Sequence, residues 1–97
     1  MRKLTKVRTS TRKLFNTMTR KVDRKNFLGI ERELALSCRD RVLRDVSENI
    51  LGPLYEGETL NGRSVKRGME EIRETLKRYR EHCLVAREWE ILLKEKH

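Results

Sequence analysis

The sequence is poor in the residues that interrupt helices, and this scarcity limits the folds it can adopt. It has one proline, Pro53, and five glycines among 97 residues. The helix-favouring residues Glu, Lys, Arg and Leu are abundant instead. The composition therefore predicts an all-α protein, and at this length we expect a single domain, residues 1–97, with a thin core.

Cysteine, histidine and aromatic residues are also scarce. Cys38 and Cys83 are far apart in the chain, no CxxC is present, and His82 and His97 are the only histidines. We therefore expect no metal site built from this chain alone. Each cysteine falls on an apolar stripe, which predicts two buried thiols rather than a disulfide.

Long apolar runs are absent, and so are acidic residues near the start. No run approaches the roughly 20 residues that span a bilayer, so we expect no transmembrane helix. The first segment also lacks the continuous apolar region of a secretory signal. The first acidic residue is Asp23. The cations that precede it are Arg2, Lys3, Lys6, Arg8, Arg12, Lys13, Arg20 and Lys21.

Apolar residues recur among these cations at intervals of three, four and seven, which predicts a helix with one apolar stripe and an otherwise cationic surface. The stripe consists of Leu4, Val7, Leu14, Phe15, Met18 and Val22. Four functions fit such a helix: a targeting peptide, a nucleic-acid-binding arm, a membrane-surface helix, or a helix that binds an acidic partner.

The periodicity predicts three helices at about residues 4–21, 28–49 and 64–95, with a polar junction at 23–26. Residues 51–62 contain Gly52 and Pro53 and read as a long loop, after which Ser64 is the expected N-cap. We therefore expect a three-helix, up-down-up bundle with an extended C-terminal helix. Trp89, Leu92 and Leu93 would form a protein interface on the segment that projects beyond the bundle.

Catalytic motifs are missing from the sequence. It has no Gly-rich phosphate loop, no GxSxG and no HExxH. The carboxylates alternate with Lys and Arg at helical spacing, which indicates a solvated, salt-bridged surface rather than an acid pair. We therefore expect that the protein is not an enzyme.

Nucleic acid is the obvious partner for a chain with a net charge of +9 and a pI of about 10.1. The few aromatic residues are not interleaved with the basic ones, however, so base stacking is not indicated. The short turn of a helix-turn-helix is also missing. Binding to the nucleic-acid backbone, as in a ribosome-associated protein, stays open, and so does a phage or viral helical adaptor.

Several residues, in this order, carry a family resemblance. Leu14-Phe15-Asn16 is followed by Arg20 and Phe27, then by the basic second helix, then by a third helix with Gly68 among apolar residues. This order resembles the LYR-motif family of small mitochondrial three-helix proteins. Asn16 departs from the Arg that ends the family's triplet, which puts recognition by the iron–sulfur transfer machinery in doubt.

The resemblance implies a non-enzymatic accessory subunit or assembly factor in the mitochondrial matrix or on the matrix side of the inner membrane, without certain cleavage of the N-terminus. Family members bind the acidic acyl carrier protein and serve a respiratory complex or the mitochondrial ribosome. The partner-binding residues would be Lys13, Leu14, Phe15, Arg20, Phe27, Arg39, Arg41 and Arg44.

The resemblance also implies a slot for the acylated 4'-phosphopantetheine of a bound acyl carrier protein, with no cofactor bound by this chain directly. Small and apolar side chains between the helices would form it: Ala35, Cys38, Val42, Gly68 and Ile72. Burial of an acyl chain there would contribute on the order of 0.8 kcal/mol per CH₂. Close helix packing is the other explanation for Gly68.

Overall fold

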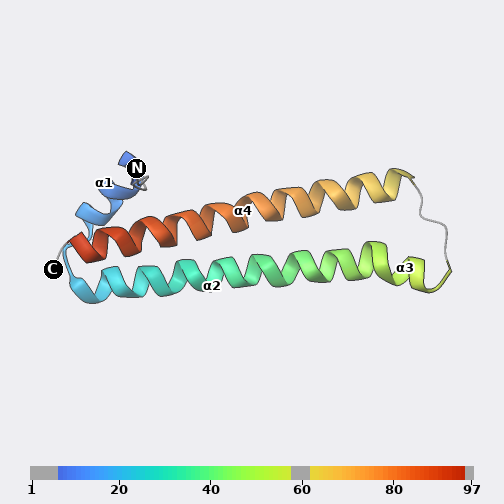
Figure 1. Cartoon of the computed structure of the whole chain (residues 1–97), viewed down its shortest axis with the longest axis horizontal. Coiled ribbons are helices and arrows are strands. Elements are labelled where there is room, and N and C mark those ends of the chain that lie inside the picture. The colour runs from blue at the N-terminus through green and yellow to red at the C-terminus, as the bar shows by residue number, and fades with distance from the viewer. Residues whose placement is uncertain (1–6, 58–61, 96–97) are drawn as a thin grey trace, which may run out of the picture. The chain divides into compact units, whose positions relative to one another are not determined.

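The structure, a computed structural model, describes residues 7–57 and 62–95, with the side chains of residues 63 and 64 excepted. The described chain is helical and contains no β-strand in these ranges, which confirms the all-α class. Its elements are α1 (Thr9–Thr17), α2 (Lys21–Val46), a π-helical segment η1 (Ser47–Leu51), α3 (Gly52–Tyr55) and α4 (Gly62–Glu95) (Figure 1).

The chain divides into two compact units. Unit 1 combines Met1–Leu34 with Glu81–His97, and unit 2 is Ala35–Arg80. Unit 1 therefore holds α1, the first part of α2 and the last part of α4, whereas unit 2 holds the rest of those two helices with η1 and α3. The expectation of a single domain and of an up-down-up bundle stays a prediction.

The first helix is shorter than the predicted 4–21. It spans Thr9–Thr17 and ends at Met18, whose backbone is extended. The guanidinium group of Arg24 donates two hydrogen bonds, of 3.1 and 3.2 Å, to the carbonyl oxygen of Phe15. The backbone N–H of Met18 donates to the same oxygen at 3.2 Å, so the side chain of Arg24 reinforces the end of α1. Residues 4–6 of the predicted range lie outside the described residues.

The break between the first two helices is therefore at residues 18–20, not at the predicted junction 23–26. Residues 23–26 are helical, and α2 begins at Lys21 rather than near Leu28. Polar residues alone do not interrupt a helix, because they can remain solvated on its outer face. Met18 instead leaves the helix and packs against the core of unit 1.

The predicted loop 51–62 is wrong in its first part. Residues 47–51 continue from α2 as a π-helical turn and residues 52–55 form α3. Pro53 lies in the first turn of α3, where its missing N–H costs no helical hydrogen bond. Residues 58–61 of the loop lie outside the described residues. The predicted cap at Ser64 falls within α4, which begins at Gly62, and its side chain is not described.

The core of unit 1 is centred on Trp89. Phe15, Leu28, Ala86, Trp89 and Leu92 are buried together, and Phe27 packs beside them. The rings of Phe15 and Trp89 meet edge to face at 5.1 Å between centroids. The prediction that Trp89 and Leu92 form a protein interface is therefore wrong, because both are buried inside this chain.

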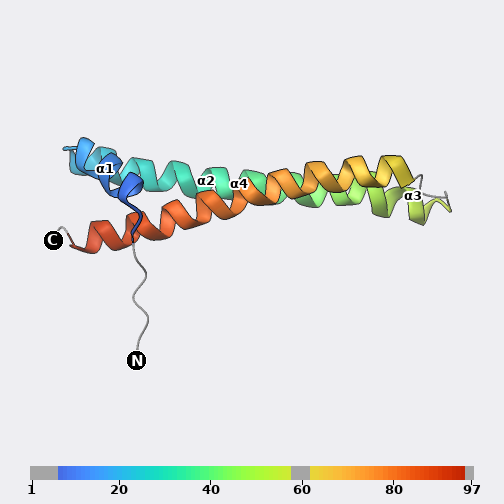
Figure 2. The same cartoon turned by 90° about the horizontal axis from the view of Figure 1, so that it is seen from above.

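Unit 2 has a much smaller buried core. Ala35 is its buried hydrophobic residue among those described, and Gly68 and Thr75 are also buried. Within unit 2, residues 35–46 of α2 and residues 62–80 of α4 run side by side in opposite directions (Figures 1 and 2). Large apolar side chains on both remain exposed, among them Leu43 of α2 and Met69 of α4.

Candidate functional site

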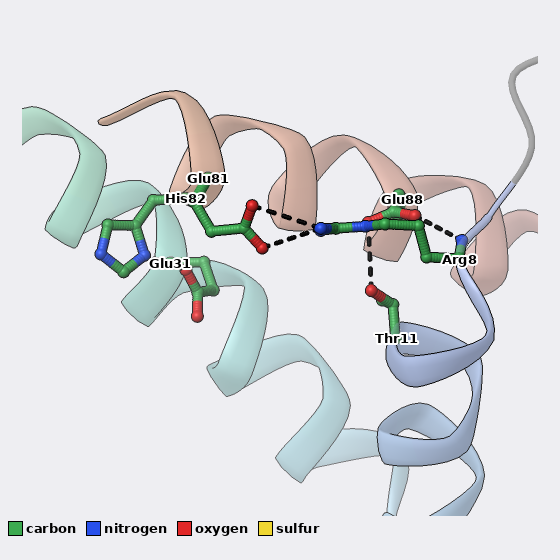
Figure 3. Close-up of polar contacts among 6 residues, drawn as sticks. All are labelled: Arg8, Thr11, Glu31, Glu81, His82 and Glu88. Atoms are coloured by element: carbon green, nitrogen blue, oxygen red, sulfur yellow. Dashed lines mark hydrogen bonds and ion pairs between the residues drawn. The ribbon is translucent and has the colours of Figure 1, made fainter. Parts of the chain in front are cut away.

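An ion-pair cluster joins the start of α1 to α4 in unit 1. The carboxylate of Glu88 is fully buried, and the guanidinium group of Arg8 donates to its Oε1 from Nη2 at 2.8 Å and from Nε at 3.0 Å (Figure 3). The hydroxyl of Thr11 donates to the same oxygen at 3.0 Å. Arg8 also reaches the exposed Glu81, with 2.9 Å between Nη1 and Oε1.

Glu88 also serves the N-terminus of α1, of which Arg8 is the N-cap residue. The backbone N–H of Arg8 donates to Oε2 of Glu88, and Thr11 belongs to the first turn of that helix. A carboxylate at this end is favoured by the helix dipole and satisfies a donor that the helix itself leaves unpaired. The cluster therefore positions α1 on α4.

The charges of the cluster shift the pKa of both ionisable partners. Burial by itself raises the pKa of the Glu88 carboxyl, but the hydrogen bonds from Arg8 and Thr11 together outweigh it and hold that pKa below its ordinary value. The hydrogen bond to Glu88 raises the pKa of Arg8. Both groups are therefore charged near neutral pH, as an ion pair that stabilises the fold.

Other carboxylates of α4 engage further cations of unit 1. Arg12 Nη1 lies 3.3 Å from Glu95 Oε2, and Arg32 Nη2 lies 2.6 Å from Glu90 Oε1. His82 Nδ1 lies 2.6 Å from Glu31 Oε2. Part of the cationic opening segment is thus neutralised within the fold, which the acid-free sequence before Asp23 did not indicate.

Four cations of residues 13–25 form the candidate partner-binding surface of unit 1. Lys13, Lys21 and Lys25 are exposed and make no ion pair with any described residue. Arg20 is exposed and has only a distant contact, 3.9 Å, with Asp23. Unit 1 contains fourteen Lys and Arg residues against seven Asp and Glu, so most of the net charge of the chain belongs to it.

The predicted partner-binding residues of unit 1 divide into two groups. Lys13, Leu14 and Arg20 are exposed, as a docking surface requires. Phe15 is fully buried, and Phe27 is half-buried with its ring centroid 4.2 Å from that of Trp89. Phe15 and Phe27 therefore pack in the core of unit 1, whereas the exposed cations lie on its surface.

The other three predicted partner-binding residues, Arg39, Arg41 and Arg44, belong to unit 2 and are exposed. Arg39 contacts Asp40 at 3.7 Å and Arg41 contacts Asp45 at 4.0 Å, distances typical of weak surface pairs. Arg44 makes no ion pair with any described residue.

The residues of the predicted acyl slot all fall within unit 2, and the slot itself stays a prediction. Ala35 and Gly68 are buried, whereas Cys38, Val42 and Ile72 are half-buried. A Cβ atom added to Gly68 would lie 3.7 Å from Cβ of Asn49, an ordinary contact that indicates close packing beside this glycine. Ile72 alone among the five lines the apolar hollow of this unit.

Both cysteines are free, as expected, but each is half-buried rather than buried. The described residues contain no group of three or more His, Cys, Asp or Glu side chains placed to hold a metal ion. Among the described helices, none combines the length and the apolar character needed to cross a membrane.

Sequence reasoning missed Arg8, Thr11 and Glu88, since it assigned all carboxylates to the solvated surface. Glu88 lies three residues after Val85 and four before Leu92, on an apolar face of α4. A carboxylate at such a position signals a buried, paired group.

No family model matches this sequence, and comparison with curated proteins and with solved structures found no similar protein. The resemblance to LYR-motif proteins therefore depends on the quoted residues alone and stays a hypothesis.

Proposed function

We propose that this protein is a non-enzymatic accessory subunit or assembly factor that binds an acidic protein partner through unit 1. The observation that carries the proposal is the set of exposed cations Lys13, Arg20, Lys21 and Lys25 in unit 1, which internal carboxylates leave largely unpaired. Such a surface attracts acidic proteins and accelerates their encounter.

The LYR-like residues suggest a specific version of this proposal. In it, the partner is the mitochondrial acyl carrier protein, the location is the matrix or the matrix side of the inner membrane, and the pair joins a respiratory complex or the mitochondrial ribosome. Supporting residues are Leu14, which is exposed next to Lys13, and Arg20, which follows at the spacing of the resemblance.

Binding to a nucleic-acid backbone is the alternative that the same cations support. Base stacking has less support, because Phe15 and Trp89 are buried and Phe27 is stacked within the core. Tyr55 is exposed, but it lies in unit 2 and is distant in sequence from these cations, so it adds no support for base stacking beside them.

We expect the tagged full chain, isolated from mitochondria, to co-purify with acyl carrier protein, and a Lys13→Glu/Arg20→Glu/Lys21→Glu variant to lose it. The reversed charges would repel the acidic partner without touching the core. Mass spectrometry of the captured chains is the measurement, and Arg87→Glu, an exposed cation on α4, is the matched control. Absence of acyl carrier protein from the wild-type sample, with helical content preserved, would contradict the specific proposal.

A further inference from the structure

An apolar hollow opens on one side of unit 2, between the α2–η1 segment and α4. Its volume is about 330 Å³. It is lined by Val46, Ile50, Met69, Ile72, Arg73 and Leu76, of which only Arg73 is charged. Met69 is 51% exposed and Leu76 is 39% exposed, so the hollow is an open groove.

The apolar surface continues beyond the hollow along α2. Leu43 lies three residues before Val46 on the same face and is 63% exposed, and Leu36 lies two further turns away and is also exposed. From Leu36 to Ile50 this row is about 21 Å long at the helical rise per residue. Together with the hollow, we call it the unit 2 groove.

Cations border this groove on both helices. Lys66 and Arg80 are each seven residues from Arg73 on α4, and Arg39 is seven residues before Val46 on α2, so helical periodicity places all four on the groove side. Lys66, Arg73 and Arg80 are exposed and make no ion pair with any described residue. Arg39 differs from these three in that it contacts Asp40 at 3.7 Å.

The other side of unit 2 has a different character. A hollow of about 230 Å³ there is lined by polar and charged residues alone, three of them carboxylates and two of them arginines: Arg41, Glu70, Glu71, Glu74, Thr75 and Arg78. The two sides of this helix pair therefore differ in charge as well as in polarity, which gives the groove side a defined electrostatic preference.

We propose that the unit 2 groove binds an amphipathic helix of a partner protein, one that carries Asp or Glu beside its apolar stripe. An open row of half-exposed side chains suits a helix laid along it, whereas small ligands occupy clefts that enclose most of their surface. A second copy of this chain placed face to face would oppose cation to cation, which disfavours self-association. The inference concerns a different surface from that in unit 1.

The test uses the full chain and a fluorescein-labelled peptide of about three heptads, with Leu at the two core positions and Glu at the flanking ones. Fluorescence anisotropy should show saturable binding of this peptide, and none of a matched peptide with Lys in place of each Glu. Arg73→Glu should weaken binding about tenfold and allow the Lys peptide to bind. The matched control is Arg78→Glu, the same charge change on the opposite side of α4, which should leave the affinity within about twofold.

Circular dichroism of each variant establishes that the helices persist. Equal binding of the two peptides, or equal losses from the two Arg variants, would overturn the proposal. So would sedimentation that shows a dimer abolished by Met69→Glu, or binding to phosphatidylglycerol vesicles abolished by the same change. If neither peptide binds the unit 2 groove, the proposed binding of acyl carrier protein to unit 1 is unaffected, because neither peptide resembles the fold of that protein.

Discussion

At the scale of single residues, Glu88 is the buried carboxylate that connects the start of α1 to α4. It is fully buried, accepts hydrogen bonds from the side chain and backbone of Arg8, and also accepts one from Thr11. Removal of one partner from such a pair leaves the other without its hydrogen bonds, which costs more than the loss of a surface contact. Exposed pairs such as Arg32–Glu90 contribute at most about 1 kcal/mol.

We predict that Glu88→Gln lowers the free energy of unfolding by about 2–4 kcal/mol, because the amide cannot balance the charge of Arg8. Glu90→Gln, the matched change at the exposed pair, should cost no more than about 1 kcal/mol. Urea titrations followed by circular dichroism measure both. Equal costs for the two variants would contradict the assigned role of Glu88.

The pH dependence of stability follows from the same residue. The pKa of Glu88 is lower in the folded state, so its contribution is complete above the unfolded-state pKa, about 4.3. That contribution is lost as the pH falls through the lower folded-state value. Urea titrations between neutral and acidic pH should therefore show a loss of stability in wild type that is smaller in Glu88→Gln.

At the scale of helices and turns, the sequence predicts which segments are helical better than it predicts where the first two helices begin and end. The helical class and the long last helix follow from composition and periodicity alone. The ends of α1 and α2 did not follow, because contacts distant in sequence decide them. Arg24 reaches back to the carbonyl of Phe15, and Glu88 comes from the far end of the chain to the start of α1.

The π-helical turn shows a second limit of sequence reasoning. The N–H of Gly52 donates to the carbonyl oxygen of Ser47, one residue further back than in an α-helix. A Cβ atom at Gly52 would lie 3.0 Å from that oxygen. Gly52 and Pro53 therefore signal a wider turn and a new helix start here, whereas the same pair in most sequences signals a loop.

We predict opposite effects of alanine at two glycines in unit 2. Gly68→Ala should raise the free energy of unfolding by up to about 1 kcal/mol, because its Cβ finds an ordinary contact and alanine favours the helix. Gly52→Ala should lower it, because its Cβ crowds the Ser47 carbonyl. Thermal unfolding gives the sign of each effect, and Gly29→Ala, with open space around it, is the control. Stabilisation by Gly52→Ala would contradict the close approach described for the π-helical turn.

At the scale of the whole molecule, the sequence predicts the net charge, but the structure shows which of the charged side chains are paired within the fold. The opening cations suggested one uniform docking or targeting surface. Arg8 and Arg12 are instead paired with carboxylates of α4, which leaves Lys13, Arg20 and Lys21 as the exposed set. No local pattern near the N-terminus could have revealed this, since Glu88 and Glu95 lie some eighty residues away.

The most direct test of the central claim is a calorimetric titration of the purified chain with purified acyl carrier protein at low and high salt. We predict saturable binding that weakens as salt rises and is lost in the Lys13→Glu/Arg20→Glu/Lys21→Glu variant, because the exposed cations of unit 1 provide the attraction. An absence of binding at low salt, or an affinity that these charge reversals leave unchanged, would contradict the claim.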